Sequence, residues 1–166
     1  MRTLLTGGAL AALTLALAAC GGSGSNSASQ EALQRDAAMH AISQIERQFH
    51  EAISKKDLDM MVGLFAEHAT GTFRPGQTVS GRQQIEDVWK NSVAWKPETH
   101  WLSDHPAYKL KVTISGDRGT LHFECHFVDV DTGKVAAVTA GNLDVAKIDG
   151  RWLITNFAGS TSELKI

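Results

Sequence analysis

The spacing of apolar residues changes from helical to alternating near His100, and this change is the strongest constraint on the fold. Upstream of it, Ile42, Ile45, Phe49 and Ile53 recur every three or four residues in a polar background. Such spacing predicts an amphipathic helix of about 20 residues. Downstream, apolar and polar residues alternate, which predicts strands. Helices followed by strands are typical of an α+β domain.

Two shorter helices are predicted between these regions. Asp57 is a good N-cap for a helix over residues 58–65, and Ser80 with Gln83 forms a capping box that opens a third helix. Arg74-Pro75-Gly76 separates residues 70–73 from residues 77–79 and predicts the turn of a short hairpin.

Four strand-like runs end the chain, joined by Gly- and Asp-containing turns. This regular turn chemistry predicts an antiparallel meander. One face of such a sheet has to be covered, and the three upstream helices are available to cover it. The runs are residues 99–114, 119–129, 134–148 and 151–158.

The chain begins with an apolar leader behind Arg2, which is typical of a secretory signal peptide over residues 1–19. Leu17-Ala18-Ala19-Cys20 resembles the lipobox of bacterial lipoproteins. That resemblance implies cleavage before Cys20 and lipidation of its thiol by acyl chains such as palmitate. It also implies attachment to the periplasmic face of the cell envelope. Gly21, where sorting signals place Asp, favours the outer membrane.

Residues 20–30 are expected to form a flexible tether, because the Gly- and Ser-rich sequence from Gly21 to Ser29 cannot bury apolar surface. Residues 31–166 then form one domain. Its other cysteine, Cys125, is left without a disulfide partner once Cys20 is lipidated.

Charge argues against nucleic acid as a partner. The chain has 16 Lys and Arg residues against 18 Asp and Glu residues, for a formal net charge of −2. Nucleic-acid binding depends on neutralising phosphates with a basic surface, which this composition does not provide.

Four segments carry a resemblance to a known family. They are residues 49–59 (Phe-His-Glu-Ala-Ile-Ser-Lys-Lys-Asp-Leu-Asp), 64–70 (Leu-Phe-Ala-Glu-His-Ala-Thr), 80–82 (Ser-Gly-Arg) and 149–154 (Asp-Gly-Arg-Trp-Leu-Ile). In order and spacing they resemble the NTF2-like, or SnoaL-like, superfamily over residues 38–158. The resemblance implies a cone in which N-terminal helices pack on a strongly curved antiparallel sheet around an apolar pocket. It also implies a homodimer through the outer face of the sheet.

The superfamily includes ketosteroid isomerase, scytalone dehydratase and polyketide cyclases. The isomerase uses a tyrosine and an aspartate base. By the resemblance, these positions fall at Phe49 and Phe73, whose rings can neither donate a hydrogen bond nor accept a proton. The chain is therefore not expected to isomerise steroids by that machinery.

Histidine is the remaining candidate for acid–base chemistry near neutral pH. His100 resembles the pocket histidine of the dehydratases. On the strand of residues 119–129, alternation places His122, Glu124 and His126 on one face and Leu121, Phe123, Cys125 and Phe127 on the other. If the polar face lines the pocket, Glu124 and His126 are expected to act with His100. If the apolar face does, which a helix-covered surface favours, the polar trio faces water or a partner subunit.

No metal or cofactor is expected. His122 and His126 would lie roughly 13 Å apart on a strand, too far to share one ion.

The expected ligand is a small hydrophobic or polycyclic molecule, because aromatic and aliphatic residues suggest an apolar cavity. The alternative is a lyase, dehydratase or isomerase that uses His100 as its general acid or base. The residues predicted to line the cavity are Phe49, Phe65, Phe73, Trp89, Leu121, Phe123, Phe127 and Trp152.

Overall fold

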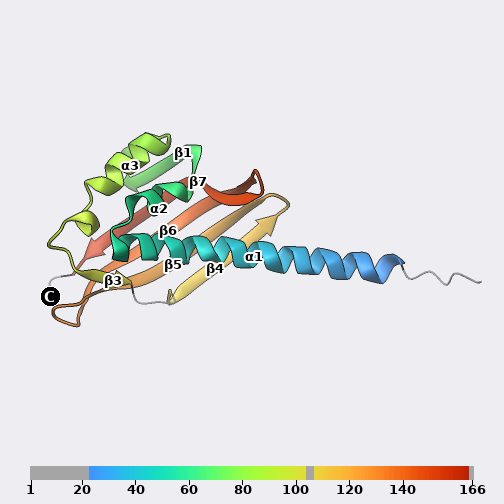
Figure 1. Ribbon diagram of the computed structural model, residues 1–166, viewed down its shortest axis with the longest axis horizontal. Coiled ribbons are helices and arrows are strands. Elements are labelled where there is room, and N and C mark those ends of the chain that lie inside the picture. The colour runs from blue at the N-terminus through green and yellow to red at the C-terminus, as the bar shows by residue number, and fades with distance from the viewer. Residues whose placement is uncertain (1–22, 104–106, 165–166) are drawn as a thin grey trace, which may run out of the picture.

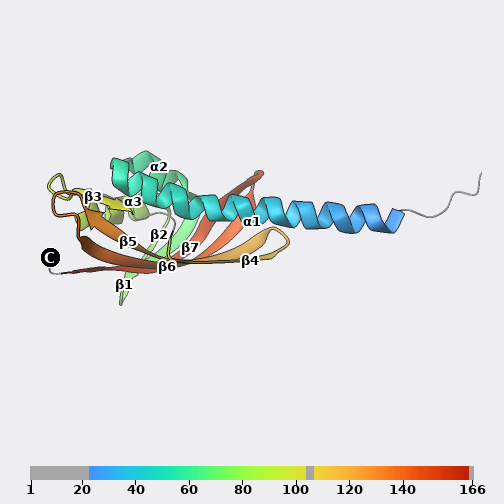
Figure 2. The same cartoon turned by 90° about the horizontal axis from the view of Figure 1, so that it is seen from below.

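The chain folds as one long sheet with helices on one of its faces (Figures 1 and 2). The computed structural model describes residues 23–103 and 107–164. The helices are α1 (Ser23–Lys55), α2 (Leu58–Gly63), α3 (Arg82–Lys90) and the 3-10 helix η1 (Val93–Trp95). The strands are β1 (Phe65–Arg74), β2 (Gln77–Ser80), β3 (Trp101–Ser103), β4 (Lys109–Ser115), β5 (Arg118–Asp129), β6 (Val135–Ile148) and β7 (Arg151–Glu163).

The described strands form a mixed sheet rather than the purely antiparallel one predicted. Their order is β2-β1-β7-β6-β5-β3, with β4 also pairing with β5. The meander β5-β6-β7 is antiparallel as predicted, but β1 joins β7 in parallel, with Phe65 opposite Ile154. Turn chemistry predicts the pairing of consecutive strands, whereas the place where an upstream hairpin joins the sheet depends on contacts between distant segments.

The run predicted as one strand over residues 99–114 is two strands in the structure. β3 pairs with the C-terminal end of β5, where Ser103 lies opposite Phe127. β4 pairs with the N-terminal part of β5, from Arg118 to Glu124. Both therefore occupy the same edge of β5 (Figure 1).

Helix α1 has 33 residues and is longer than predicted. It begins at Ser23, so its first turns occupy residues that we expected to form a flexible tether. The side chains of residues 27–37 are exposed, and the close packing against the sheet begins at Ile42. Good helix formers such as Glu31, Ala32 and Leu33 allow the helix to extend beyond the part that packing stabilises. Residues 1–22, with the predicted signal peptide and Cys20, lie outside the described residues.

Local capping agrees with the sequence at one helix and differs at another. Asp57 caps α2 as predicted, and its carboxylate accepts a hydrogen bond from the Met60 amide at 2.8 Å. The predicted capping box of Ser80 and Gln83 is wrong. Gly81 is the N-cap of α3, and Gln84 at the third helical position accepts from the Ser80 amide at 3.1 Å. The helix starts one residue later than predicted, which moves the capping role from Gln83 to Gln84.

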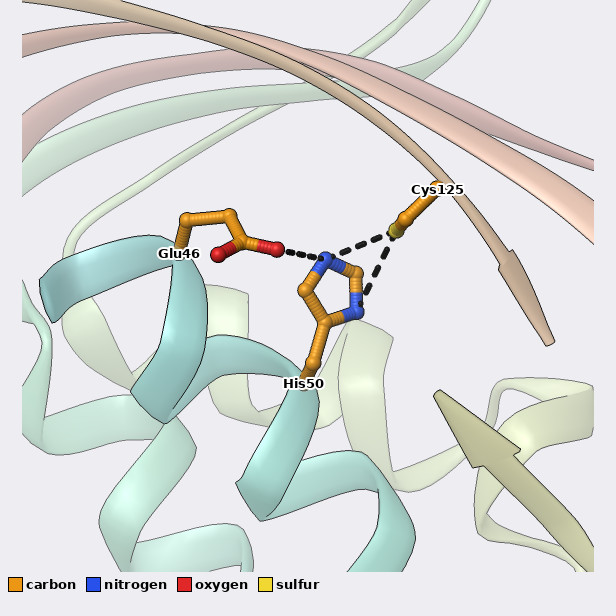
Figure 3. A group of neighbouring side chains, drawn as sticks. All are labelled: Glu46, His50 and Cys125. Atoms are coloured by element: carbon orange, nitrogen blue, oxygen red, sulfur yellow. Dashed lines mark hydrogen bonds and ion pairs between the residues drawn. The ribbon is translucent and has the colours of Figure 1, made fainter. Parts of the chain in front are cut away.

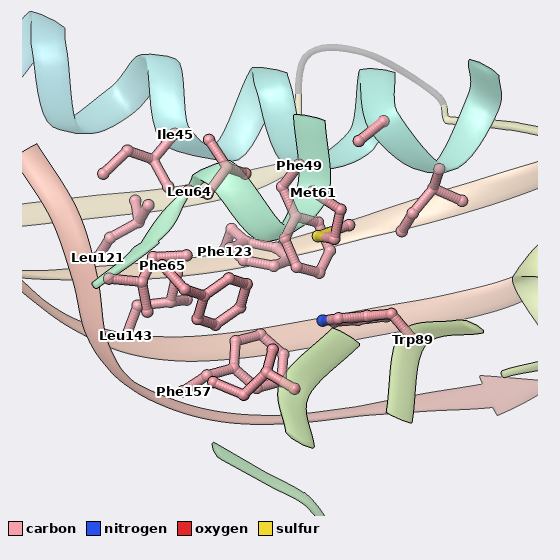
Figure 4. Close-up of a cluster of buried hydrophobic side chains, with 14 of the residues drawn as sticks. Ile45, Phe49, Met61, Leu64, Phe65, Trp89, Leu121, Phe123, Leu143 and Phe157 are labelled. Atoms are coloured by element: carbon pink, nitrogen blue, oxygen red, sulfur yellow. The ribbon is translucent and has the colours of Figure 1, made fainter. Parts of the chain in front are cut away.

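The core lies between the helices and the facing side of the sheet (Figure 4). Phe49 on α1 is at its centre, with ring centroids 5.1 Å from Trp89, 5.4 Å from Phe123 and 5.8 Å from Phe157. Four inward residues of β5 are buried: Leu121, Phe123, Cys125 and Phe127. Of the two orientations considered for β5, the structure therefore has the apolar face toward the helices.

None of the described helices combines enough length with enough apolar sequence to cross a membrane.

Candidate functional site

A cavity of about 710 Å³ opens between α3 and the sheet. Its wall combines segments that are far apart in the sequence: the β1–β2 hairpin, α3 with η1, and the ends of β5, β6 and β7. The apolar part of the wall includes Ile53, Phe73, Val79, Val88, Trp89, Val93, Ala94, Phe127 and Phe157. Charged and amide side chains also line it: Arg74, Gln77, Gln84, Asp87, Asn91 and Glu163.

Aromatic contacts hold the apolar wall in shape. Phe73 meets Trp89 edge to face, with ring centroids 5.3 Å apart and an interplanar angle of 89°. Phe73 also stacks on Phe157 at 5.0 Å and 27°. Such pairs are among the preferred arrangements of aromatic rings. A flat apolar molecule could therefore pack against rigid rings.

Two buried polar atoms belong to residues on this wall. Trp89 Nε1 and Ser92 Oγ are both inaccessible to solvent, and neither has a hydrogen-bond partner within the described part of the chain. Thr139, another buried wall residue, uses its hydroxyl differently. Its Oγ1 donates to the Ser160 carbonyl at 3.2 Å and accepts from the Thr161 hydroxyl at 3.1 Å. The indole N–H and the Ser92 hydroxyl are thus two buried donors whose hydrogen-bonding capacity the described residues leave unused.

The residues predicted to line the cavity are divided by the structure. Phe73, Trp89 and Phe127 belong to the wall. The others are not among its lining residues: Phe49, Phe65, Leu121 and Phe123 are fully buried in the core, and Trp152 is partly buried against it. Side chains of α1 and α2 fill this part of the space between helices and sheet (Figure 4). Composition predicts an apolar interior but does not show which part of it stays hollow.

The predicted catalytic residues do not meet at the cavity. His100 lies before β3 with half of its side chain exposed, and its Nδ1 is 2.8 Å from Asp131 Oδ2 in the β5–β6 turn. Glu124 and His126 belong to the outward set of β5, because the residues that alternate with them face the core. Strand alternation therefore separates Glu124 and His126 from the cavity, and none of the three residues lines it.

Glu124 belongs instead to a polar network on the outer face. Its carboxylate accepts hydrogen bonds from Tyr108 at 2.9 Å and from Lys109 at 3.0 Å. His122 Nε2 lies 3.3 Å from the same group. Hydrogen bonding to Lys109 and Tyr108 lowers the pKa of Glu124 below its ordinary value, so it is ionised at neutral pH. A carboxylate of this kind is a poor general acid.

A second cluster, which the sequence reasoning did not identify, lies inside the core (Figure 3). It consists of Glu46 and His50 on α1 and Cys125 on β5, all buried. His50 Nε2 is 3.3 Å from Glu46 Oε1 and 2.8 Å from Cys125 Sγ. Burial raises the pKa of Glu46 to about 7. We call these three residues the Glu46–His50–Cys125 cluster.

The sequence contains a signal for two of the three residues of this cluster. Glu46 and His50 are four residues apart in the predicted helix and adjoin the apolar positions Ile45 and Phe49, so both fall on the stripe that must be buried. Cys125 belongs to the inward set of β5. Only the packing of α1 across β5 brings the three together.

A family model described as a SnoaL-like domain matches residues 34–158. The chain belongs to this family. The expected resemblance is thereby confirmed. A search of curated protein sequences gives no match.

Solved structures confirm the NTF2-like fold of this SnoaL-like domain. A hexachlorocyclohexane dehydrochlorinase of Novosphingobium barchaimii LL02 is similar, at 18% identity, with a TM-score of 0.63 over 80% of this chain and 93% of that one. So is a putative dehydratase of the NTF2-like family from Streptomyces avermitilis, at 12% identity and a TM-score of 0.61 over 76% and 97%. An NTF2-like protein of unknown function from Pseudomonas putida KT2440 is similar at 14% identity, with a TM-score of 0.64 over 75% of this chain and 87% of that one. At these identities the similarity concerns the fold, on which different chemistries occur.

Proposed function

We propose that this SnoaL-like domain binds a small, mainly apolar molecule that carries a hydrogen-bond acceptor, in the cavity beside α3. The single observation that supports this proposal most strongly is the pair of buried donors, Trp89 Nε1 and Ser92 Oγ, on a wall that also carries aromatic rings. Leaving a buried donor unsatisfied costs about 1–3 kcal/mol. An acceptor on the ligand would recover part of this free energy.

The size and composition of the cavity agree with the proposal. Pockets for small organic ligands usually measure about 300–1,000 Å³ and combine apolar walls with a few polar groups. The cavity, at about 710 Å³, falls in this range. Its aromatic wall favours a ring-containing ligand, and its donors favour a ketone, ether or similar acceptor.

Binding is favoured over a lyase reaction that uses His100. A general acid or base has to come within hydrogen-bond reach of the reacting group. No histidine is among the described residues that line the cavity, and His100 is paired with Asp131 at the surface. The dehydratase and dehydrochlorinase activities named for the similar structures belong to those proteins.

A pair of fluorescent probes tests the proposal. 6-Propionyl-2-(dimethylamino)naphthalene carries a ketone acceptor, whereas N-phenyl-1-naphthylamine presents similar aromatic surface without one. Trp89→Phe removes the indole N–H and keeps an aromatic ring. We expect it to weaken binding of the ketone probe about 5- to 10-fold, as expected for one neutral hydrogen bond of about 1 kcal/mol. Binding of the amine probe should change less than 2-fold.

Trp152→Phe is the matched control, because Trp152 lies on β7 and does not line the cavity. It should alter the affinity of neither probe. Absence of binding by both probes to the folded wild-type chain would refute the proposal. Equal losses for both probes in Trp89→Phe would refute the role of the indole donor.

We also propose that the domain is tethered to a membrane through a lipid on Cys20, on the periplasmic face and at the outer membrane. The lipobox-like sequence supports this proposal. Because α1 begins at Ser23, part of the tether is helical. The exposed residues 27–37 of α1 extend beyond the sheet (Figure 2), so a helical stalk would hold the cavity away from the bilayer. Incorporation of labelled palmitate that is abolished by Cys20→Ala, followed by membrane fractionation, tests the proposal. Equal labelling of both proteins would refute it. The homodimer through the outer sheet face remains a prediction.

A further inference from the structure

We propose that the Glu46–His50–Cys125 cluster is a binding site for one divalent cation of the zinc class. This site is separate from the cavity, and the proposal does not depend on what the cavity binds. It differs from our expectation that the chain holds no metal, which concerned His122, Glu124 and His126 on one strand and His100 beside it.

The three donor atoms converge on one point, although they come from two elements. Glu46 and His50 are one helical turn apart on α1, and Cys125 faces them from β5 (Figure 3). One atom from each of the three side chains lies within 4.8 Å of the other two. In a tetrahedral zinc site, neighbouring nitrogen, oxygen and sulfur ligands are about 3.3–3.6 Å apart. The His50–Glu46 distance of 3.3 Å already agrees with this geometry. The His50–Cys125 distance of 2.8 Å would have to lengthen slightly.

The orientation of the imidazole distinguishes this cluster from a catalytic relay. In a nucleophile–histidine–acid relay, the nucleophile and the acid contact different ring nitrogens. Here Nε2 of His50 contacts both Glu46 Oε1, at 3.3 Å, and Cys125 Sγ, at 2.8 Å, and the sulfur lies farther from Nδ1, at 3.5 Å (Figure 3). One nitrogen with one lone pair or one proton cannot form two good hydrogen bonds of this kind. A cation between the three atoms accommodates all of them.

The donor set also suits the cation. Cysteine sulfur, histidine nitrogen and carboxylate oxygen are all established zinc ligands. When the Cys125 thiol and the Glu46 carboxyl release their protons to solvent, the two side chains carry two negative charges, and His50 is neutral. A divalent cation compensates this charge in the buried interior, where uncompensated charges are costly.

The surroundings hold the ligands in place. The His50 ring is enclosed by aromatic rings, with centroids 5.3 Å from Phe49, 5.1 Å from Phe123 and 5.5 Å from Phe127. His50 and Cys125 are both 0% exposed, so the cation has to enter while the chain folds or opens locally. Three protein ligands leave one tetrahedral position for a small ligand such as water.

Cobalt(II) provides a direct test, because it substitutes for zinc and reports its ligands spectroscopically. The complete chain, without a histidine tag, is unfolded by a denaturant in the presence of a chelator. Both are then removed while the chain refolds with Co²⁺. We expect one Co²⁺ per chain, a thiolate-to-cobalt charge-transfer band, and the intense visible bands of tetrahedral cobalt. Cys125→Ser should abolish the charge-transfer band. Glu46→Gln should weaken Zn²⁺ binding more than about 100-fold, since loss of a residue that only hydrogen-bonds a metal ligand already costs about 10–100-fold.

The opposite face of β5 provides a matched control. His122 and Glu124 are the same residue types and lie 3.3 Å apart, but they are on the outer face of the sheet. His122→Gln and Glu124→Gln should leave the cobalt spectrum unchanged. A second measurement uses only the wild-type chain, so it does not depend on whether the variants fold. Zn²⁺ should raise the Tm of the wild-type chain. A folded wild-type chain that shows neither the cobalt bands nor this rise in Tm would overturn the proposal. A charge-transfer band that persists in folded Cys125→Ser would also overturn it.

Discussion

The ring of Phe73 on β1 lies perpendicular to the indole of Trp89 on α3, and this contact joins the hairpin to the helix at the wall of the cavity. The two ring centroids are 5.3 Å apart. Phe73 occupies the position that the family resemblance assigned to a catalytic aspartate. The site where an isomerase would hold its base is therefore an aromatic surface in this chain.

Replacement of Phe73 by alanine should enlarge the cavity and destabilise the fold. Phe73 is only partly buried, so we expect a loss of about 2 kcal/mol, below the 3–5 kcal/mol typical of a fully buried phenylalanine. Urea unfolding measures this change. Leu102→Ala on β3, where 51% of the side chain is exposed, should change the free energy of unfolding by less than about 0.5 kcal/mol. Equal effects of the two substitutions would contradict the proposed role of Phe73.

Two adjacent lysines at the end of α1 should differ strongly in their effect on stability. Lys56 Nζ donates to the carbonyls of Ala94 and Thr99, each at 2.6 Å, and so connects α1 to the segment around η1. Lys56→Met should cost about 1.5–3 kcal/mol, the usual value of hydrogen bonds to a charged group. Lys55 is exposed and pairs only with Glu51 in the described structure. Lys55→Met should leave the free energy of unfolding nearly unchanged in the same measurement, because an exposed ion pair contributes little.

Without bound metal, the buried carboxyl of Glu46 should make stability depend on pH. Its pKa is raised from 4.5 to about 7, chiefly by burial and against the opposing charge of Arg47. The folded state therefore binds this proton more tightly than the unfolded state does. The contribution is fully present below pH 4.5 and is lost as pH rises to about 7.

Chemical unfolding at several pH values, with a chelator present, measures this dependence. Glu46→Gln should remove it, because the amide does not titrate. His50 and Cys125 face the same carboxyl, so their own titration has to be compared in both proteins. A stability profile that is identical in wild type and Glu46→Gln would contradict this prediction.

The two halves of α1 should differ in local stability. Residues 27–37 are exposed and do not belong to the hydrophobic core, whereas Ile42 and later apolar residues of α1 do. A polar helical segment without packing is marginally stable in water. Amide hydrogen exchange should therefore be much faster before Ile42 than after it. Uniform protection along α1 would indicate that another surface covers the exposed half.

The sequence predicted the class of structure well where the signal was local. The apolar spacing identified the packed part of α1, the β5–β7 alternation identified the meander, and Asp57 marked the start of α2. The extension of α1 to Ser23 was missed, because a Gly- and Ser-rich composition predicts coil on average. The parallel pairing of β1 with β7 was missed, because it joins segments about 90 residues apart.

The site was predicted less well, for a related reason. His100 was favoured because of its place before a strand, but its side chain meets Asp131 at the surface. Glu46 and His50 were overlooked as polar residues of a helix, although their positions on its buried stripe were readable. No property of Cys125 in the sequence indicates that it faces His50.

The sequence by itself determined which face of each helix and strand is apolar, since the periods of 3.6 and 2 residues follow from backbone geometry. It thereby indicated an α+β domain and favoured the orientation in which Phe123 and Phe127 face inward, which the structure shows. Only the tertiary structure decided that Trp89 and Ser92 line a hollow and that Glu46, His50 and Cys125 share one point. These juxtapositions depend on how α1 and α3 lie across the sheet, which is set by the packing of many side chains together rather than by any local pattern.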